Sequence, residues 1–170
     1  MSKQRRQGGF LLIEALIAIL IFSLGILGMV AMGGAAVGAQ SDARYRNDAA
    51  ALADEIANRM AVDALRSLEP VSGPDLVLAG SLAAYQYQPT TGATPCTFSG
   101  SMSTLPTVTN WIDLVRADGS GAHRLPGATA LTEQIRVDST GGVNQVSITL
   151  CWQGPNDSAQ RRHTLVTYIN

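Results

Sequence analysis

The sequence predicts an α+β protein in which a long N-terminal helix, membrane-spanning in its first half, packs on a small C-terminal antiparallel β-sheet. An apolar run extends from Phe10 to about Ala39 and is long enough to cross a bilayer as a helix. A stripe of apolar residues with helical spacing then continues to Leu68, as expected for a helix that lies on a domain. Three β-like runs occupy the last third of the chain, at residues 134–137, 145–153 and 164–169.

The charges set an orientation for the apolar run. Lys3, Arg5 and Arg6 precede it without any acidic residue among them, although the 170-residue chain has a formal net charge of −1. Basic residues beside a membrane helix stay on the cytoplasmic side, so we expect a cytoplasmic N-terminus and an exported remainder. Nucleic-acid binding is not predicted, because it needs a clustered basic face.

One carboxylate lies near the start of the apolar run. It belongs to Glu14, and a charge at such a place costs several kcal/mol in lipid. A secretory signal peptide has an apolar core of only about 7–15 residues before its cleavage site. A simple signal anchor explains the length of the run, but it explains neither Glu14 nor the Gly8-Gly9 pair in front of it.

The segment Gly9-Phe10-Leu11-Leu12-Ile13-Glu14 resembles the processing motif of the prepilin family, the type IV pilins and type II secretion pseudopilins with class III signal peptides. The resemblance implies that a prepilin peptidase cuts between Gly9 and Phe10 and N-methylates Phe10. Glu14 stands where that family has its glutamate. Four helical residues rise about 6 Å, so the terminal amine of a neighbouring subunit could meet this carboxylate within a filament. The alternative is a protonated, merely tolerated glutamate.

These observations divide the chain into four parts: a cleaved leader at 1–9, a membrane and filament-core helix at 10–39, an amphipathic continuation at 40–69, and an exported domain at 70–170. In the continuation, Leu52, Ile56, Met60 and Ala64 recur every four residues, which predicts a stripe facing the domain core. Pro70 is expected to end the helix by Glu69. Glycines in the apolar run could line a helix-packing seam or permit local unwinding; they are Gly25, Gly28, Gly33, Gly34 and Gly38.

The exported domain is predicted to begin with irregular chain. Residues 71–108 are rich in Ser, Thr, Gly and Pro, which predicts mostly loop with a short element at about 82–88. Thr109 or Asn110 is expected to cap a short helix that contains Trp111 and ends near 118–121. The three β-like runs are expected to form an antiparallel meander, with turns at 139–142 and 154–157.

The two cysteines, Cys96 and Cys151, both lie in the exported part. They are predicted to form a disulfide that ties the loop-rich middle of the chain to the sheet; the alternative is two free, buried thiols. No catalytic residue, metal site or cofactor is predicted, because His, Cys, Asp and Glu show no spacing typical of a zinc site or a nucleophile. Calcium in the turns at Asp138 or 156–157 would lack a full ligand set.

Further segments resemble minor pilins of the type IV pilus; they are residues 23–28, 50–60, 111–112, 125–128, 147–153 and 163–170. The resemblance implies a non-enzymatic subunit that moves from the inner membrane, with its C-terminal domain in the periplasm, into an extracellular pilus. The implied partners are the prepilin peptidase, other minor pilins, the major pilin, the inner-membrane assembly platform and a tip adhesin. One alternative is a type II secretion minor pseudopilin, and another is a signal-anchored periplasmic enzyme or sensor.

Overall fold

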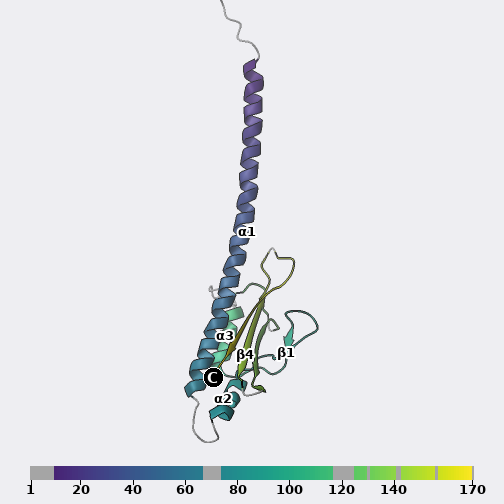
Figure 1. The fold of residues 1–170 in the computed structure, drawn as a ribbon. Helices are drawn as coiled ribbons and strands as arrows, with labels where there is room; N and C mark the ends of the chain where they lie inside the picture. Colours follow the sequence, from purple (N-terminus) through teal and green to yellow (C-terminus); the bar gives the residue numbers. More distant parts are fainter. Residues whose placement is uncertain are drawn as a thin grey trace, which may run out of the picture. The chain divides into compact units, whose positions relative to one another are not determined.

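The computed structural model describes residues 10–66, 74–116, 125–129, 131–140, 143–155 and 157–169. The chain divides into two compact units, Met1–Ser41 and Asp42–Asn170. Helix α1 (Phe10–Arg66) contributes to both units (Figure 1). The predicted leader at 1–9 and the predicted helix end at Pro70 lie outside the described residues.

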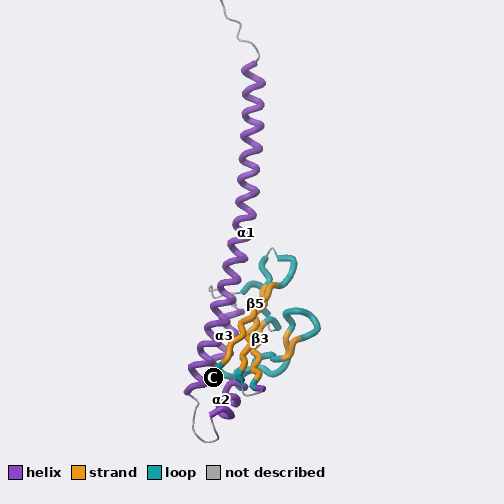
Figure 2. Tube along the Cα trace, viewed as in Figure 1, coloured by secondary structure: helices purple, strands orange, loops and turns teal. Residues whose placement is uncertain are grey.

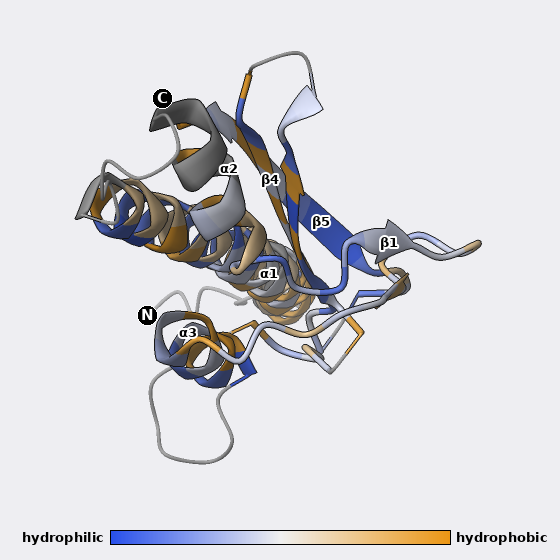
Figure 3. Ribbon diagram, turned by 90° about the horizontal axis from the view of Figure 1, so that it is seen from below, coloured by the Kyte–Doolittle hydropathy of each residue, from blue (hydrophilic) through white to orange (hydrophobic). Residues whose placement is uncertain are grey.

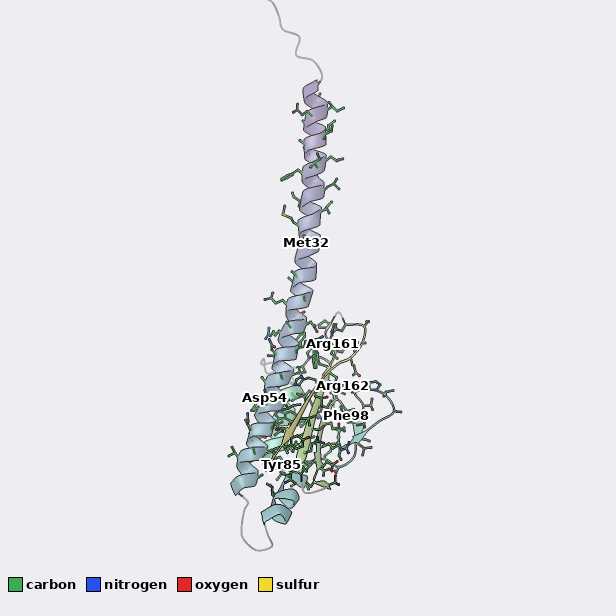
Figure 4. All side chains as sticks on the ribbon, in the orientation of Figure 1. Met32, Asp54, Tyr85, Phe98, Arg161 and Arg162 are labelled. Carbon is green, nitrogen blue, oxygen red and sulfur yellow. A yellow bond between two sulfur atoms is a disulfide. The ribbon has the colours of Figure 1, made fainter. Side chains whose placement is uncertain are left out.

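The first unit contributes one helical segment, residues 10–41 of α1, which is about 45 Å long at 1.5 Å per residue. Its described side chains are exposed, and Met32, 77% exposed, is labelled in Figure 4. Among the described residues, one helix is long and apolar enough to cross a membrane. This helix continues unbroken through the glycines that the sequence offered as places for unwinding.

In the second unit, residues 42–66 of α1 turn an apolar stripe toward the domain core. The fully or almost fully buried members of this stripe are Ala49, Ala53, Ile56, Met60 and Ala64, and Leu52 is partly buried beside them. Their spacing of three and four residues places them on one face of the helix. The predicted packing of this stripe on the C-terminal domain is therefore confirmed.

The prediction of a mostly irregular chain at 71–108 is wrong for its first part. Helix α2 (Pro74–Ala83) begins at a proline. Proline suits the first turn because its fixed φ is helical and because an N–H at this position would have no intrahelical acceptor, so its absence costs nothing. Leu78 and Leu82 bury this helix in the core. The strands β1 (Thr90–Thr91) and β2 (Phe98–Ser99) then form a short antiparallel hairpin.

Helix α3 (Pro106–Arg116) starts earlier than predicted, so the expected caps at Thr109 and Asn110 are wrong. The carbonyl of Leu105 accepts from the N–H groups of Val108 and Thr109 at 2.9 Å each. The Oγ of Ser103 accepts from the N–H of Leu105 at 3.2 Å. Another proline at a first helical position again explains the start, and the predicted end at 118–121 lies outside the described residues.

The predicted meander is confirmed by strands β3 (Glu133–Asp138), β4 (Gln145–Trp152) and β5 (Arg161–Tyr168), which are antiparallel in the order β3-β4-β5 (Figure 2). Val146, Ile148, Leu150 and Trp152 of β4 belong to the main core. The expected half-burial of β4 is wrong beyond Ile148, because Thr149 and Cys151 on the other face are buried as well. Figure 3 shows the contrast in hydropathy between β4 and the largely hydrophilic β5.

Candidate assembly site

The first part of the candidate site is the start of α1. Gly9 and the side chain of Phe10 lie outside what the structure describes, whereas Glu14 is exposed. Leu12, Ile13 and Leu16 beside it are 55–72% exposed. A carboxylate is thus presented on a helix whose other nearby side chains are apolar.

The helix itself gives this carboxylate a defined position. Glu14 is the fifth residue of α1, so its Cα lies about 6 Å along the helix axis from that of Phe10 at 1.5 Å per residue. A charge here has no counter-charge within the described part of the first unit. In an apolar surrounding an unpaired carboxylate is costly, and a cation from another molecule would offset that cost.

A second feature fixes α1 where the second unit begins. The guanidinium of Arg161 contacts Asp42 of α1 at 3.2 Å and Asp157 at 3.0 and 2.9 Å; Arg161 is labelled in Figure 4. Its hydrogen bonds lower the pKa of Asp157, which also accepts from the N–H of Gly154. The sequence prediction missed both contacts of Arg161, because residues 157–161 are not helical and no signal in the sequence places Asp42 beside them.

A third feature fixes α1 further along. The Asp63 carboxylate accepts a hydrogen bond of 2.8 Å from the hydroxyl of Tyr85, and the indole N–H of Trp111 donates to the carbonyl of Leu52 at 2.8 Å. Burial, followed by the hydrogen bond to Asp63, raises the pKa of Tyr85 to about 12. Together with the apolar stripe, these contacts make residues 42–66 an integral part of the folded domain.

An ion pair between the half-buried Arg116 and the buried Glu133 joins α3 to the sheet. Arg116 donates to the Glu133 carboxylate at 3.2 and 2.9 Å and to the Tyr87 hydroxyl at 2.7 Å. Burial raises the pKa of Glu133, which is 0% exposed, although the hydrogen bond from Arg116 opposes the shift. The same hydrogen bond raises the pKa of Arg116. The sequence prediction missed this pair, because it began the strand at Gln134.

The predicted disulfide between Cys96 and Cys151 is present, with the two Cα atoms 5.8 Å apart. It excludes the alternative of free thiols. Both sulfur-bearing residues are buried with Phe98 in a small second cluster. Since Cys151 lies in β4 and Phe98 in β2, the bond holds the hairpin on the sheet face opposite the main core, as the sequence predicted for the loop-rich middle of the chain.

The turn carboxylates are engaged in local hydrogen bonds. Asp138 accepts from the N–H and the hydroxyl of Thr140 at 3.1 and 2.6 Å, and these bonds lower its pKa. Within the described residues, no group of three or more His, Cys, Asp and Glu side chains is placed to hold a metal ion.

No protein family, curated protein or solved structure gives a match to this chain. The architecture is nevertheless pilin-like, since a long apolar N-terminal helix continues into a domain with a small antiparallel sheet and a disulfide. The described part of the first unit is an exposed apolar helix with one carboxylate, that of Glu14, near its start.

Proposed function

We propose that this chain is a minor pilin of the type IV pilus, a structural subunit and not an enzyme. It helps to prime pilus assembly and sits in a tip complex with other minor pilins. The observation that carries the proposal is the exposed apolar helix of the first unit with Glu14 as its fifth residue. The pilin-like architecture supports it, as does the similarity of several segments to the minor pilin PilV, the type IV pilus modification protein.

In this proposal the chain is first an inner-membrane protein with one span. The prepilin peptidase removes residues 1–9 on the cytoplasmic face and methylates the new N-terminus at Phe10, while the second unit, Asp42–Asn170, folds in the periplasm. The assembly platform then extracts the helix from the membrane into a growing fibre. Residues 10–39 exchange lipid for the apolar helices of other minor pilins and of the major pilin.

Glu14 has a specific role in this exchange. Cleavage creates a positive amine at Phe10, about 6 Å along the helix from Glu14. The offset favours pairing with a subunit displaced along the fibre axis, because one chain's amine then lies level with another chain's carboxylate. Removing one partner of an ion pair in such a low-dielectric setting costs about 3–5 kcal/mol, which is enough to select one register.

Processing is tested by the intact mass of the protein purified from its native membrane. The proposal expects a loss of Met1–Gly9 and the gain of one methyl group. An uncut N-terminus would contradict it and would favour a membrane-anchored periplasmic enzyme or sensor.

Assembly is tested with Glu14→Ala, with Asp54→Ala on the same helix as the matched control. We expect Glu14→Ala to reduce incorporation into fibres by at least tenfold, while processing and the fold of the second unit stay unchanged. Equal incorporation of the two variants would refute the role of Glu14. Deletion of the gene should abolish surface fibres and twitching motility; a loss of protein secretion with intact fibres would instead identify a type II secretion minor pseudopilin.

A further inference from the structure

The two edges of the three-stranded sheet differ in their backbone pairing. At the outer edge of β3, the N–H of Tyr87 donates to the carbonyl of Ile135 and the N–H of Ile135 donates to the carbonyl of Tyr87, both at 2.9 Å. The outer edge of β5 has no backbone hydrogen-bond partner among the residues that the structure describes. Unpaired edges accept additional strands unless charges, prolines or bulges block them.

The register identifies the backbone groups on the open edge. Ile169 donates to the carbonyl of Asn144 at 3.0 Å, in register with the β4–β5 ladder. Directly opposed residues in an antiparallel pair alternate between hydrogen-bonded and non-hydrogen-bonded. Every second residue of β5 therefore turns its N–H and C=O away from β4, and these residues are Arg162, Thr164, Val166 and Tyr168. The same rule can be checked on the other edge. Because Cys151 donates to the carbonyl of Thr132, Ile135 of β3 must turn its N–H and C=O away from β4, and these groups do bond to Tyr87.

The side chains of these four residues are also exposed. Val166 is 50% exposed and Tyr168 is 56% exposed. Arg162, labelled in Figure 4, has no ion-pair partner within the described parts of the chain. The strand has eight residues in continuous register with β4 and contains no proline. Of its four outward-facing residues only Arg162 is charged, so a single charge opposes the addition of another strand.

We propose that the outer edge of β5 binds an extended segment of a different polypeptide as a fourth strand. Main-chain hydrogen bonds to the outward N–H and C=O groups provide the pairing. A carboxylate of the partner lies opposite Arg162, and apolar or aromatic side chains of the partner lie beside Val166 and Tyr168. Cross-strand pairs of these kinds stabilise antiparallel sheets.

The direction of β5 argues against a second copy of this chain as an antiparallel added strand. β5 begins at Arg161, which contacts Asp42 of α1, and its end lies beside the opposite end of residues 42–66 (Figure 1). β5 and this part of α1 thus run in the same direction. A second copy added antiparallel would have its Asp42 at the far end, yet the apolar segment precedes Asp42 in both copies and must enter one membrane. This step rests on the membrane anchoring in the proposed function.

The test uses the full-length chain in the cells that produce it, with a benzophenone photocrosslinking residue in place of Tyr168. Val166→Pro removes an N–H that points away from β4, so the sheet's own ladder is kept while the added strand loses a donor. Val166→Ala is the matched control, because it shortens the same side chain but keeps the N–H.

We expect a photoadduct with a different polypeptide, at least a tenfold lower yield in Val166→Pro, and less than a twofold change in Val166→Ala. Arg162→Glu should lower the yield by about threefold or more, as for a reversed cross-strand charge pair. Replacing the acidic residue of the crosslinked partner segment by Lys should restore the yield with Arg162→Glu.

Three outcomes would overturn the proposal: no adduct, an adduct with a second copy of this chain, or an adduct that neither Val166→Pro nor Arg162→Glu weakens. Loss of the Cys96–Cys151 bond or of a thermal unfolding transition would show that Val166→Pro has misfolded. In that case the proposal is decided by the yield with Arg162→Glu and by its rescue with the acidic-to-Lys change in the partner. Membrane fractionation and intact mass of the same samples report anchoring and processing separately, so failure of the proposed function is distinguished from failure of this one.

Discussion

Removing the Cys96–Cys151 disulfide should lower the free energy of unfolding of the second unit. The position of the bond in the fold predicts how large the loss is and which residues lose structure first. The bond closes a chain separation of 55 residues, and in the chain-entropy model a loop of this size corresponds to about 4 kcal/mol of stability. The double variant Cys96→Ala/Cys151→Ala avoids leaving a free thiol. We therefore expect its free energy of unfolding to fall by about 4 kcal/mol.

The loss of structure should begin near the missing bond before it spreads to the rest of the second unit. Residues 90–99 are held by this bond and by the hydrogen bond of 3.0 Å from the N–H of Phe98 to the carbonyl of Leu131. The chain on either side is held independently, because Tyr87 is paired with Ile135 and Ser103 donates to the carbonyl of Ala84 at 2.7 Å. Amide hydrogen exchange should therefore quicken first in the β1–β2 hairpin, while α2 keeps its protection. The sequence predicted that the bond ties the loop-rich middle of the chain to the sheet, and the structure places this tie at the hairpin.

Urea unfolding of the full-length protein in detergent, followed by tryptophan fluorescence, measures the effect, because Trp111 and Trp152 are both buried in the second unit. The wild type under reducing and oxidising conditions provides the control. A stability loss below about 1 kcal/mol, or exchange that quickens equally in α2 and in the hairpin, would refute the reasoning.

Three further predictions concern the second unit. Ile56→Ala should cost about 3 kcal/mol in the same urea assay, whereas Val62→Ala, on the same helix but 48% exposed, should change stability by less than about 0.5 kcal/mol. Stability should fall as pH rises from 10 toward 12, because the folded state keeps Tyr85 protonated above its ordinary pKa of 10.0; Tyr85→Phe should flatten this part of the pH profile. Arg116→Ala should cost about 3 kcal/mol at neutral pH because Glu133 loses its buried counter-charge, and the loss should shrink as pH falls and Glu133 becomes protonated.

The sequence was sufficient to predict an element and its buried face where a periodic pattern of apolar residues extends over many positions. The stripe through Ile56 and Met60 spans several helical turns, and the alternation in β4 spans eight residues. The disulfide could be predicted because two cysteines in an exported domain allow only one intramolecular bond. In the helix stripe, and for the core-facing residues of β4, the local pattern and the tertiary contacts require the same residues to be buried. The alternation in β4 did not predict the burial of Thr149 and Cys151 on the other face.

The sequence was insufficient to predict helix starts that depend on one or two residues, and contacts between residues that lie far apart in the chain. Gly73-Pro74 and the Leu105-Pro106 start are compatible with a loop as well as with a first helical turn, so α2 was missed and α3 was begun too late. The contacts from Arg161 to Asp42 and from Arg116 to Glu133 join residues 119 and 17 positions apart. Nothing in the spacing of charges marks Glu133 as buried, since its burial follows from the position of α3.

The two parts of α1 use small residues for different reasons. Ala49, Ala53 and Ala64 are at most 1% exposed, so their small size is already used within the chain, to let the helix approach the domain core. A Cβ added at Gly25 or Gly28 would meet no atom within 4 Å, so nothing within the described chain requires a glycine there. Glycine is costly in a helix interior, and close approach between helices is the gain that offsets the cost in membranes. In the proposed function, these glycines let the apolar helices of other subunits approach closely once the helix has left lipid.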